Sequence, residues 1–119
     1  MTAPELRDKL AFIVPAFASY WTSPDNLFRH EAGEDAICGV FTAFSYFVRE
    51  HFRSIEPRVL DALGQFTERC LETRGSELWN DCRACLLENL VSYDFTASFT
   101  AHLGPRGKAC MAELHGDAV

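Results

Sequence analysis

Two cysteines spaced as Cys82-x-x-Cys85 are the residues whose type and spacing most directly suggest chemistry in this chain. Thiolates at this spacing bind zinc or form a redox-active pair. Two further zinc ligands would have to come from the remaining candidates, which are Cys70, Cys110, His102 and His115. Both cysteines nevertheless continue the apolar face of a predicted helix, where a free cysteine packs as a small hydrophobic residue. We therefore predict core packing for Cys82 and Cys85, with no metal and no cofactor.

A group of ionisable residues between positions 30 and 35 is the other candidate for chemistry. His30 stands with Glu31, Glu34 and Asp35, a set that can in principle bind a cation or transfer protons. Such sites need side chains that converge on a pocket, and adjacency within one loop does not provide that convergence. Carboxylates that precede a helix also stabilise its positive end. We favour this structural role, so the sequence predicts a protein without enzymatic activity.

The composition predicts one acidic globular domain over residues 1–119. Nearly half of the residues are hydrophobic and ten are phenylalanine, which is enough for a core but not for two. Eleven Lys and Arg against 17 Asp and Glu give a net charge of −6. Such a surface repels nucleic-acid backbones and anionic membranes and attracts basic partners. We expect a protein partner, and neither nucleic acid nor membrane.

The cysteine count and the N-terminal sequence predict a cytoplasmic location. Five cysteines are an odd number, and the first residues lack the basic and apolar blocks of a secretory signal. The apolar run Leu10–Ala18 is too short to cross a bilayer. We therefore expect reduced thiols in the cytosol.

Hydrophobic periodicity predicts helices along almost the whole chain. The first begins at the capping box Thr2-x-x-Glu5, and Pro15 should kink or break it near Val14. Residues 22–33 are expected to be a loop with at most one helical turn. Apolar stripes then predict two helices, over 37–52 and 57–71. Gly75 marks the end of the second helical segment.

Three further helices complete the predicted fold. Ser76 caps one that extends to Leu90, with Asn89 directed into its apolar face as a hydrogen-bonded tie to a neighbouring turn. A short helix should follow over 95–103, and Pro105 opens the last. No pair of alternating strands is visible. The sequence thus predicts an all-α domain of five or six antiparallel helices, arranged as stacked helical hairpins.

Acidic residues are the candidate partner-binding groups. Asp61, Glu68 and Glu72 share one face of the 57–71 helix, and Glu77 and Asp81 repeat the pattern on the next helix. If these helices form a hairpin, the two rows lie side by side facing water, although an ordinary solvated surface has the same pattern. A second candidate is the acidic aromatic loop, whose members in the predicted interface are Trp21, Asp25, Glu31, Glu34 and Asp35. Trp79 is the other candidate aromatic anchor.

Two short sequence motifs resemble those of a known group of proteins. Ala84-Cys-Leu-Leu-Glu-Asn-Leu90 and Leu103-Gly-Pro-Arg106 follow the Phe-rich segment Phe41–Val48. This arrangement resembles small helical immunity proteins of bacterial polymorphic toxins, including those of contact-dependent growth inhibition systems. The resemblance extends loosely over residues 37–110. It implies a cytosolic protein without activity of its own, which binds one cognate toxin, often a basic nuclease, and blocks its active site.

Two other functions stay open at this point. The chain is alternatively a helical adaptor or scaffold for an unrelated bacterial protein. The other alternative is a small metal-dependent enzyme that uses the His30 group or the Cys82–Cys85 pair. A toxin gene beside the gene for this chain would discriminate against the adaptor, and metal analysis would discriminate against the enzyme.

Overall fold

The N-terminal segment forms two helices that separate at a proline. The structure is a computed structural model that describes residues 1–24, 26 and 36–118. Helix α1 spans Ala3–Ile13 and α2 spans Ala16–Thr22. The break falls at Val14 and Pro15, as predicted, because proline cannot continue the hydrogen-bond ladder of α1. At the start of α1, the Glu5 amide donates to the Thr2 hydroxyl, and that hydroxyl donates to the Glu5 carboxylate.

The central part of the chain forms the two long helices predicted from apolar periodicity. Helix α3 spans Ile37–His51 and is followed by a short 3-10 turn, η1, over Phe52–Ser54. Helix α4 spans Pro57–Cys70 and begins with proline at a position where its missing N–H costs nothing. The chain then turns at Gly75, whose φ of +84° places it in the left-handed region that favours glycine.

The C-terminal half contains less regular helix than the sequence predicts. Helix α5 spans Glu77–Asp81 and is capped by the Ser76 hydroxyl, which accepts from the Trp79 amide. It continues as a π-helix, η2, over Cys82–Leu87 and a 3-10 turn, η3, over Glu88–Leu90. Helices α6, Thr96–Ala101, and α7, Pro105–Ala118, follow. The sequence predicts one helix from Ser76 to Leu90. The structure instead has an α-helix, a π-helix and a 3-10 turn in succession over this range.

The all-α prediction is confirmed for the described residues, which contain helices and no strand. These described residues form seven α-helices, close to the expected five or six. The predicted loop at 22–33 lies mostly outside the described residues. None of the helices in the described ranges is long and apolar enough to cross a membrane.

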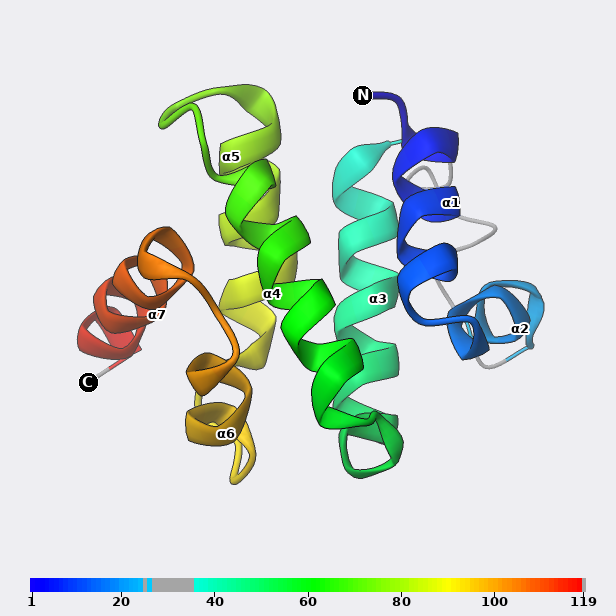
Figure 1. The fold of residues 1–119 in the computed structure, drawn as a ribbon. Coiled ribbons are helices and arrows are strands. Elements are labelled where there is room, and N and C mark those ends of the chain that lie inside the picture. Colours follow the sequence, from blue (N-terminus) through cyan, green and yellow to red (C-terminus); the bar gives the residue numbers. More distant parts are fainter. Residues whose placement is uncertain (25, 27–35, 119) are drawn as a thin grey trace.

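Helix α3 and the segment from α5 to η3 form the centre of the arrangement. They pack directly against each other, while α4 passes diagonally across them, as Figure 1 shows. The chain reverses direction between α3 and α4 and again between α4 and α5, whereas the neighbours α1 and α3 run the same way (Figure 1). Helix α1 contacts α3 and α4 on one side, and α7 contacts α4 and η2 on the other.

Aromatic packing fills the contact between α2 and α3. Phe17 of α2 makes an edge contact with Phe44 of α3 at a ring-centroid distance of 4.9 Å, and Phe47 and Trp21 complete the cluster. Both Phe17 and Phe44 are fully buried. On the far side, α4 approaches the end of α6 so closely that a Cβ at Gly64 would lie 1.9 Å from the His102 carbonyl oxygen. Only glycine fits at this crossing.

Truncation of Phe44 to Ala should destabilise the protein by about 3–5 kcal/mol, because it leaves a cavity among the rings of the core. Phe12→Ala is the matched control: its ring is 88% exposed, so we expect a change within about 0.5 kcal/mol. Urea unfolding followed by circular dichroism measures both. Equal losses for the two variants would contradict the assignment of the core.

Candidate functional site

A disulfide between Cys38 and Cys85 joins α3 to η2. The two residues are 47 positions apart in sequence, and their Cα atoms are 5.3 Å apart. The expectation of five reduced thiols is therefore wrong for this pair. Cys85 is buried, as predicted. Its role is more than core packing, however, because it is covalently bonded to a cysteine on another helix. The Cys82-x-x-Cys85 spacing is misleading because these two residues do not pair with each other.

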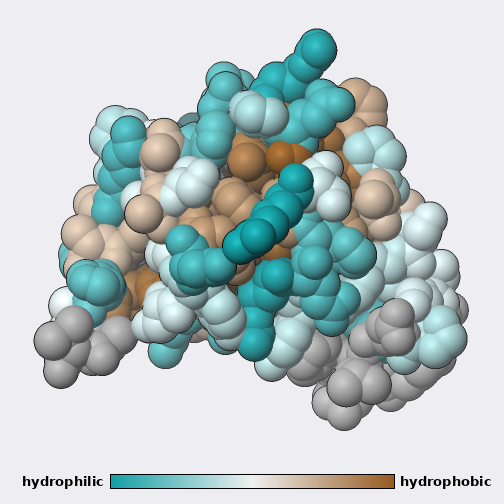
Figure 2. All heavy atoms as spheres, turned by 90° about the horizontal axis from the view of Figure 1, so that it is seen from below, coloured by the Kyte–Doolittle hydropathy of each residue, from teal (hydrophilic) through white to brown (hydrophobic). Residues whose placement is uncertain are grey.

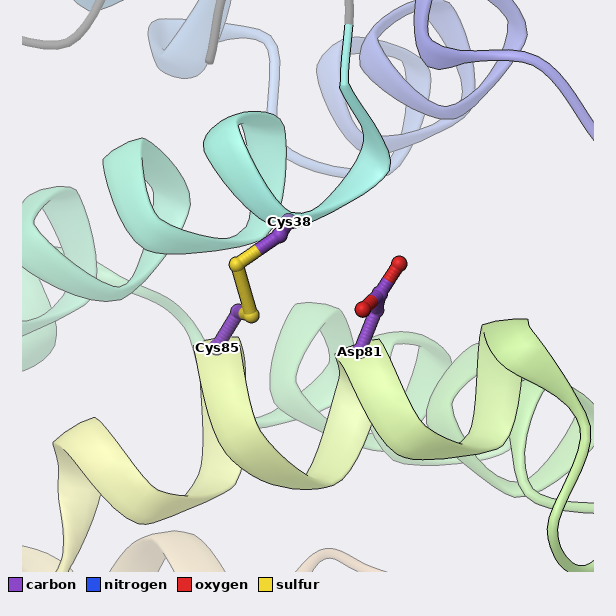
Figure 3. A group of neighbouring side chains, drawn as sticks. All are labelled: Cys38, Asp81 and Cys85. Carbon is purple, nitrogen blue, oxygen red and sulfur yellow. A yellow bond between two sulfur atoms is a disulfide. The ribbon is translucent and has the colours of Figure 1, made fainter. Parts of the chain in front are cut away.

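Asp81 lies beside this disulfide on the same side of its helix as Cys85. Figure 3 shows its side chain and that of Cys85 rising from one helix toward Cys38. One ligand atom from each of the three residues lies within 4.8 Å of the others. Partial burial, helped by the nearby Glu77 carboxylate, raises the pKa of Asp81 above its ordinary value. The site therefore combines two sulfur atoms and a carboxylate from three elements, α3, α5 and η2.

Asn89 secures the backbone below this site. Its amide donates to the Cys85 carbonyl oxygen at 2.9 Å and to the Ser45 hydroxyl of α3 at 3.3 Å. Asn89 is therefore the hydrogen-bonded tie that was predicted, but it joins η2–η3 to a helix and not to a turn. The Cys85 carbonyl lies near the end of the π-helix, where a side-chain donor can satisfy carbonyls that the helix leaves unpaired.

The three other cysteines are buried free thiols. Cys70 of α4 and Cys82 of η2 hydrogen-bond to each other, which lowers the pKa of Cys70 and, together with burial, raises that of Cys82. Burial also raises the pKa of Cys110 in α7. The packing role predicted for Cys82 is consistent with this position, since its side chain is fully buried.

The acidic row on α4 is occupied by contacts within the protein. Asp61 pairs with His102, with 2.6 Å between Oδ1 and Nδ1. The Glu68 carboxylate accepts from the backbone amides of Arg106 and Gly107 at 2.8 and 3.1 Å. These amides belong to the first turn of α7, so Glu68 is an N-terminal cap for that helix. The expectation that Glu68 faces water is wrong: its side chain is only 18% exposed.

The remaining predicted carboxylates lie elsewhere. Glu72 is exposed in the turn after α4, and Glu77 is exposed in the first turn of α5. Asp81 is half-buried and faces α3. The two rows therefore do not form one continuous surface, because α4 directs Asp61 and Glu68 toward α6 and α7 while α5 directs Asp81 toward α3.

Neither tryptophan is a fully exposed anchor. Trp21 is 6% exposed and belongs to the core cluster around Phe17, with the Arg7 guanidinium 5.8 Å from its ring centre. Its predicted role as a partner contact stays a prediction, and the structure gives the ring a packing role in the core. Trp79 is half-buried, with Arg74 at 5.1 Å from its ring. The other loop candidates, Asp25, Glu31, Glu34 and Asp35, lie outside the described residues, as does His30.

A hollow of about 530 Å³ lies between α2, the end of α3 and the start of α4. Its walls are mainly apolar and include Tyr20, Phe47 and Val59, with His51 and Glu56 as charged or ionisable members. Figure 2 views the molecule from this end and shows apolar side chains gathered between hydrophilic ones. The sequence did not indicate this feature, because its lining comes from three separate helices.

Comparison with family models, with curated proteins and with solved structures gives no significant match for this chain.

The disulfide leads us to expect a different number of reactive thiols before and after reduction. Air-oxidised protein, denatured without reductant, should react with three equivalents of a thiol reagent, and with five after reduction. Peptide mass spectrometry should find Cys38 and Cys85 unlabelled in the first sample. Labelling of either residue before reduction, or a linkage between Cys70 and Cys82 instead, would contradict the pairing.

Replacement of Glu68 by Ala should cost about 1–2 kcal/mol of unfolding free energy, because the first amides of α7 lose their charged acceptor. Glu72→Ala, four residues further along the chain and exposed, should change it by less than about 0.5 kcal/mol. Chemical denaturation of both variants checks this difference. A solvated Glu68 would give two equal, small effects.

Proposed function

We propose that this chain is a non-enzymatic binding protein whose acidic surface docks onto a basic protein partner. The observation that carries the proposal is the pair of exposed carboxylates, Glu72 and Glu77, on either side of the turn between α4 and α5. Within the described ranges neither forms an ion pair, whereas exposed carboxylates such as Asp8, Glu56 and Asp94 pair with arginines. Cationic side chains of a partner would supply the missing counter-charges.

The half-buried ring of Trp79 supports the same location. It lies two residues after Glu77, so this end of the molecule has a partly exposed aromatic ring, contacted by Arg74, beside carboxylates that form no ion pair within the described ranges. Aromatic contacts set the lifetime of many protein complexes, while charge raises the association rate. The net charge of −6 acts in the same direction over the whole surface.

We further propose that the partner is a bacterial toxin domain, which this chain neutralises by covering a basic catalytic cleft. The support for this step is the resemblance carried by residues 84–90 and 103–106 to immunity proteins. An acidic surface suits it, since nuclease clefts are built to attract phosphate groups. An adaptor bound to another basic protein is the alternative, and the identity of the partner separates the two.

The test uses the product of the gene adjacent to the one encoding this chain. Reversal of Glu72 and Glu77 to Lys should slow association with that protein by about tenfold or more at low salt and reduce its salt dependence. Asp8 and Glu56 reversed to Lys form the matched control, with the same change in net charge at positions that already have arginine partners. Stopped-flow association rates measure both.

A second charge-reversed variant tests the loop. Lysine at Asp25, Glu31 and Glu34 should give the larger defect if that segment, and not the α4–α5 turn, forms the interface. Wild-type protection of cells by both variants against the neighbouring toxin would exclude the acidic docking mechanism. If the adjacent gene encodes no toxin, the immunity role is excluded and the adaptor role replaces it.

A further inference from the structure

We propose that the reduced form of this protein binds a zinc-class divalent ion through the thiolates of Cys38 and Cys85 and the carboxylate of Asp81. Figure 3 shows these three side chains converging between α3 and the helix that carries Asp81 and Cys85. Their ligand atoms already lie within 4.8 Å of one another. The disulfide and the metal site use the same two sulfur atoms, so the protein can hold one or the other.

The spacing of the two ligands on one helix suits a metal site. Asp81 and Cys85 are four positions apart, which places both side chains on one face of a helix. The same separation carries the two histidine ligands of helical zinc sites. Cys38 completes the set from α3, whose Cα lies 5.3 Å from that of Cys85. Three protein ligands leave a fourth tetrahedral position for water or another donor.

The local backbone gives independent support. The residues after Asp81 form a six-residue π-helix, Cys82–Leu87, with Cys85 inside it. π-Helical turns are rare and are frequently found at functional sites. A disulfide that only stabilises the fold does not require a π-helical turn. Ligands that must converge on one metal ion benefit from such a turn, because it changes the direction of the side chains.

Ligand chemistry selects the kind of ion. Two thiolates and one carboxylate favour zinc or similar borderline metals over magnesium and calcium, which take oxygen ligands only. Burial of Cys85 and partial burial of Cys38 and Asp81 limit competing water. Tetrahedral coordination needs ligand atoms about 3.5–3.8 Å apart, a separation that fits within the space these three residues share once the sulfur–sulfur bond is broken.

The disulfide form converts to the metal-bound form in two steps. A dithiol reductant transfers two electrons and two protons to the disulfide, which becomes two thiols, while the reductant becomes its own disulfide. Zinc then displaces one proton from each thiol and binds the two thiolates and the carboxylate, so two protons are released per ion. In a reducing cytosol the metal-binding state is favoured, since glutathione and thioredoxin keep thiols reduced there.

Cobalt(II) binding, followed by absorption spectroscopy, tests this proposal. Full-length protein is reduced with a dithiol, freed of it by gel filtration under argon, and titrated with Co²⁺. We expect about one ion per chain, the intense visible bands of tetrahedral cobalt and a sulfur-to-cobalt charge-transfer band, all removed by added Zn²⁺. The oxidised protein should show none of these bands.

Variants identify the ligands. Cys38→Ser should abolish the charge-transfer band or reduce it strongly, and Asp81→Asn should weaken binding by more than the roughly 10- to 100-fold that loss of a supporting hydrogen bond costs. Cys110→Ser and Glu72→Gln are the matched controls and should bind cobalt like the wild type. Circular dichroism verifies that each variant is folded.

A protection measurement uses the wild-type protein and therefore does not depend on any variant folding. Zinc should slow alkylation of Cys38 and Cys85 by iodoacetamide, mapped by mass spectrometry, and leave the rates at Cys70, Cys82 and Cys110 unchanged. Absence of tetrahedral cobalt bands in the reduced protein would overturn the proposal. Bands that persist in Cys38→Ser, or protection confined to Cys70 and Cys82, would do the same.

Discussion

The contact between α3 and the helical segment from α5 to η3 is the interaction on which the rest of the structure depends. It contains the Cys38–Cys85 bond and the Asn89 hydrogen bonds. The other helices cover this pair: α1 and α4 on one side, α7 on the other. The candidate metal ligands lie at the edge of the same contact, so the geometry of the site is held by the best-packed part of the protein.

Local signals predicted the secondary structure well because each has a short-range cause. The apolar stripe of α3, the Thr2 and Ser76 caps and the break at Pro15 depend only on residues a few positions apart. The same reasoning missed the π-helix at Cys82–Leu87, since periodicity in a short window does not separate it from an α-helix. Cys85 lies within this π-helix, and its side chain and that of Asp81 rise from the same side of the helical segment (Figure 3).

Long-range pairings set the limit of prediction for the site. Nothing near Cys85 in sequence marks Cys38 as its partner, and nothing near Glu68 marks the amides of α7. Helical periodicity correctly placed Glu68 opposite the apolar stripe, but it could not show that another helix begins there. Trp21 illustrates the same limit, because its position beside a polar loop suggests an interface residue, whereas its ring packs in the core. In each case the deciding contact comes from a different helix.

These internal contacts change how the acidic character of the chain should be weighed. Net charge treats every carboxylate alike, yet Glu68 and Asp61 are bound to α7 and His102 and contribute less to an external field than free groups do. Asp81 is turned toward sulfur atoms instead of solvent. Glu72 and Glu77 are exposed and form no ion pair within the described ranges. The proposed docking surface at the α4–α5 turn rests on these two carboxylates and not on the total charge of −6.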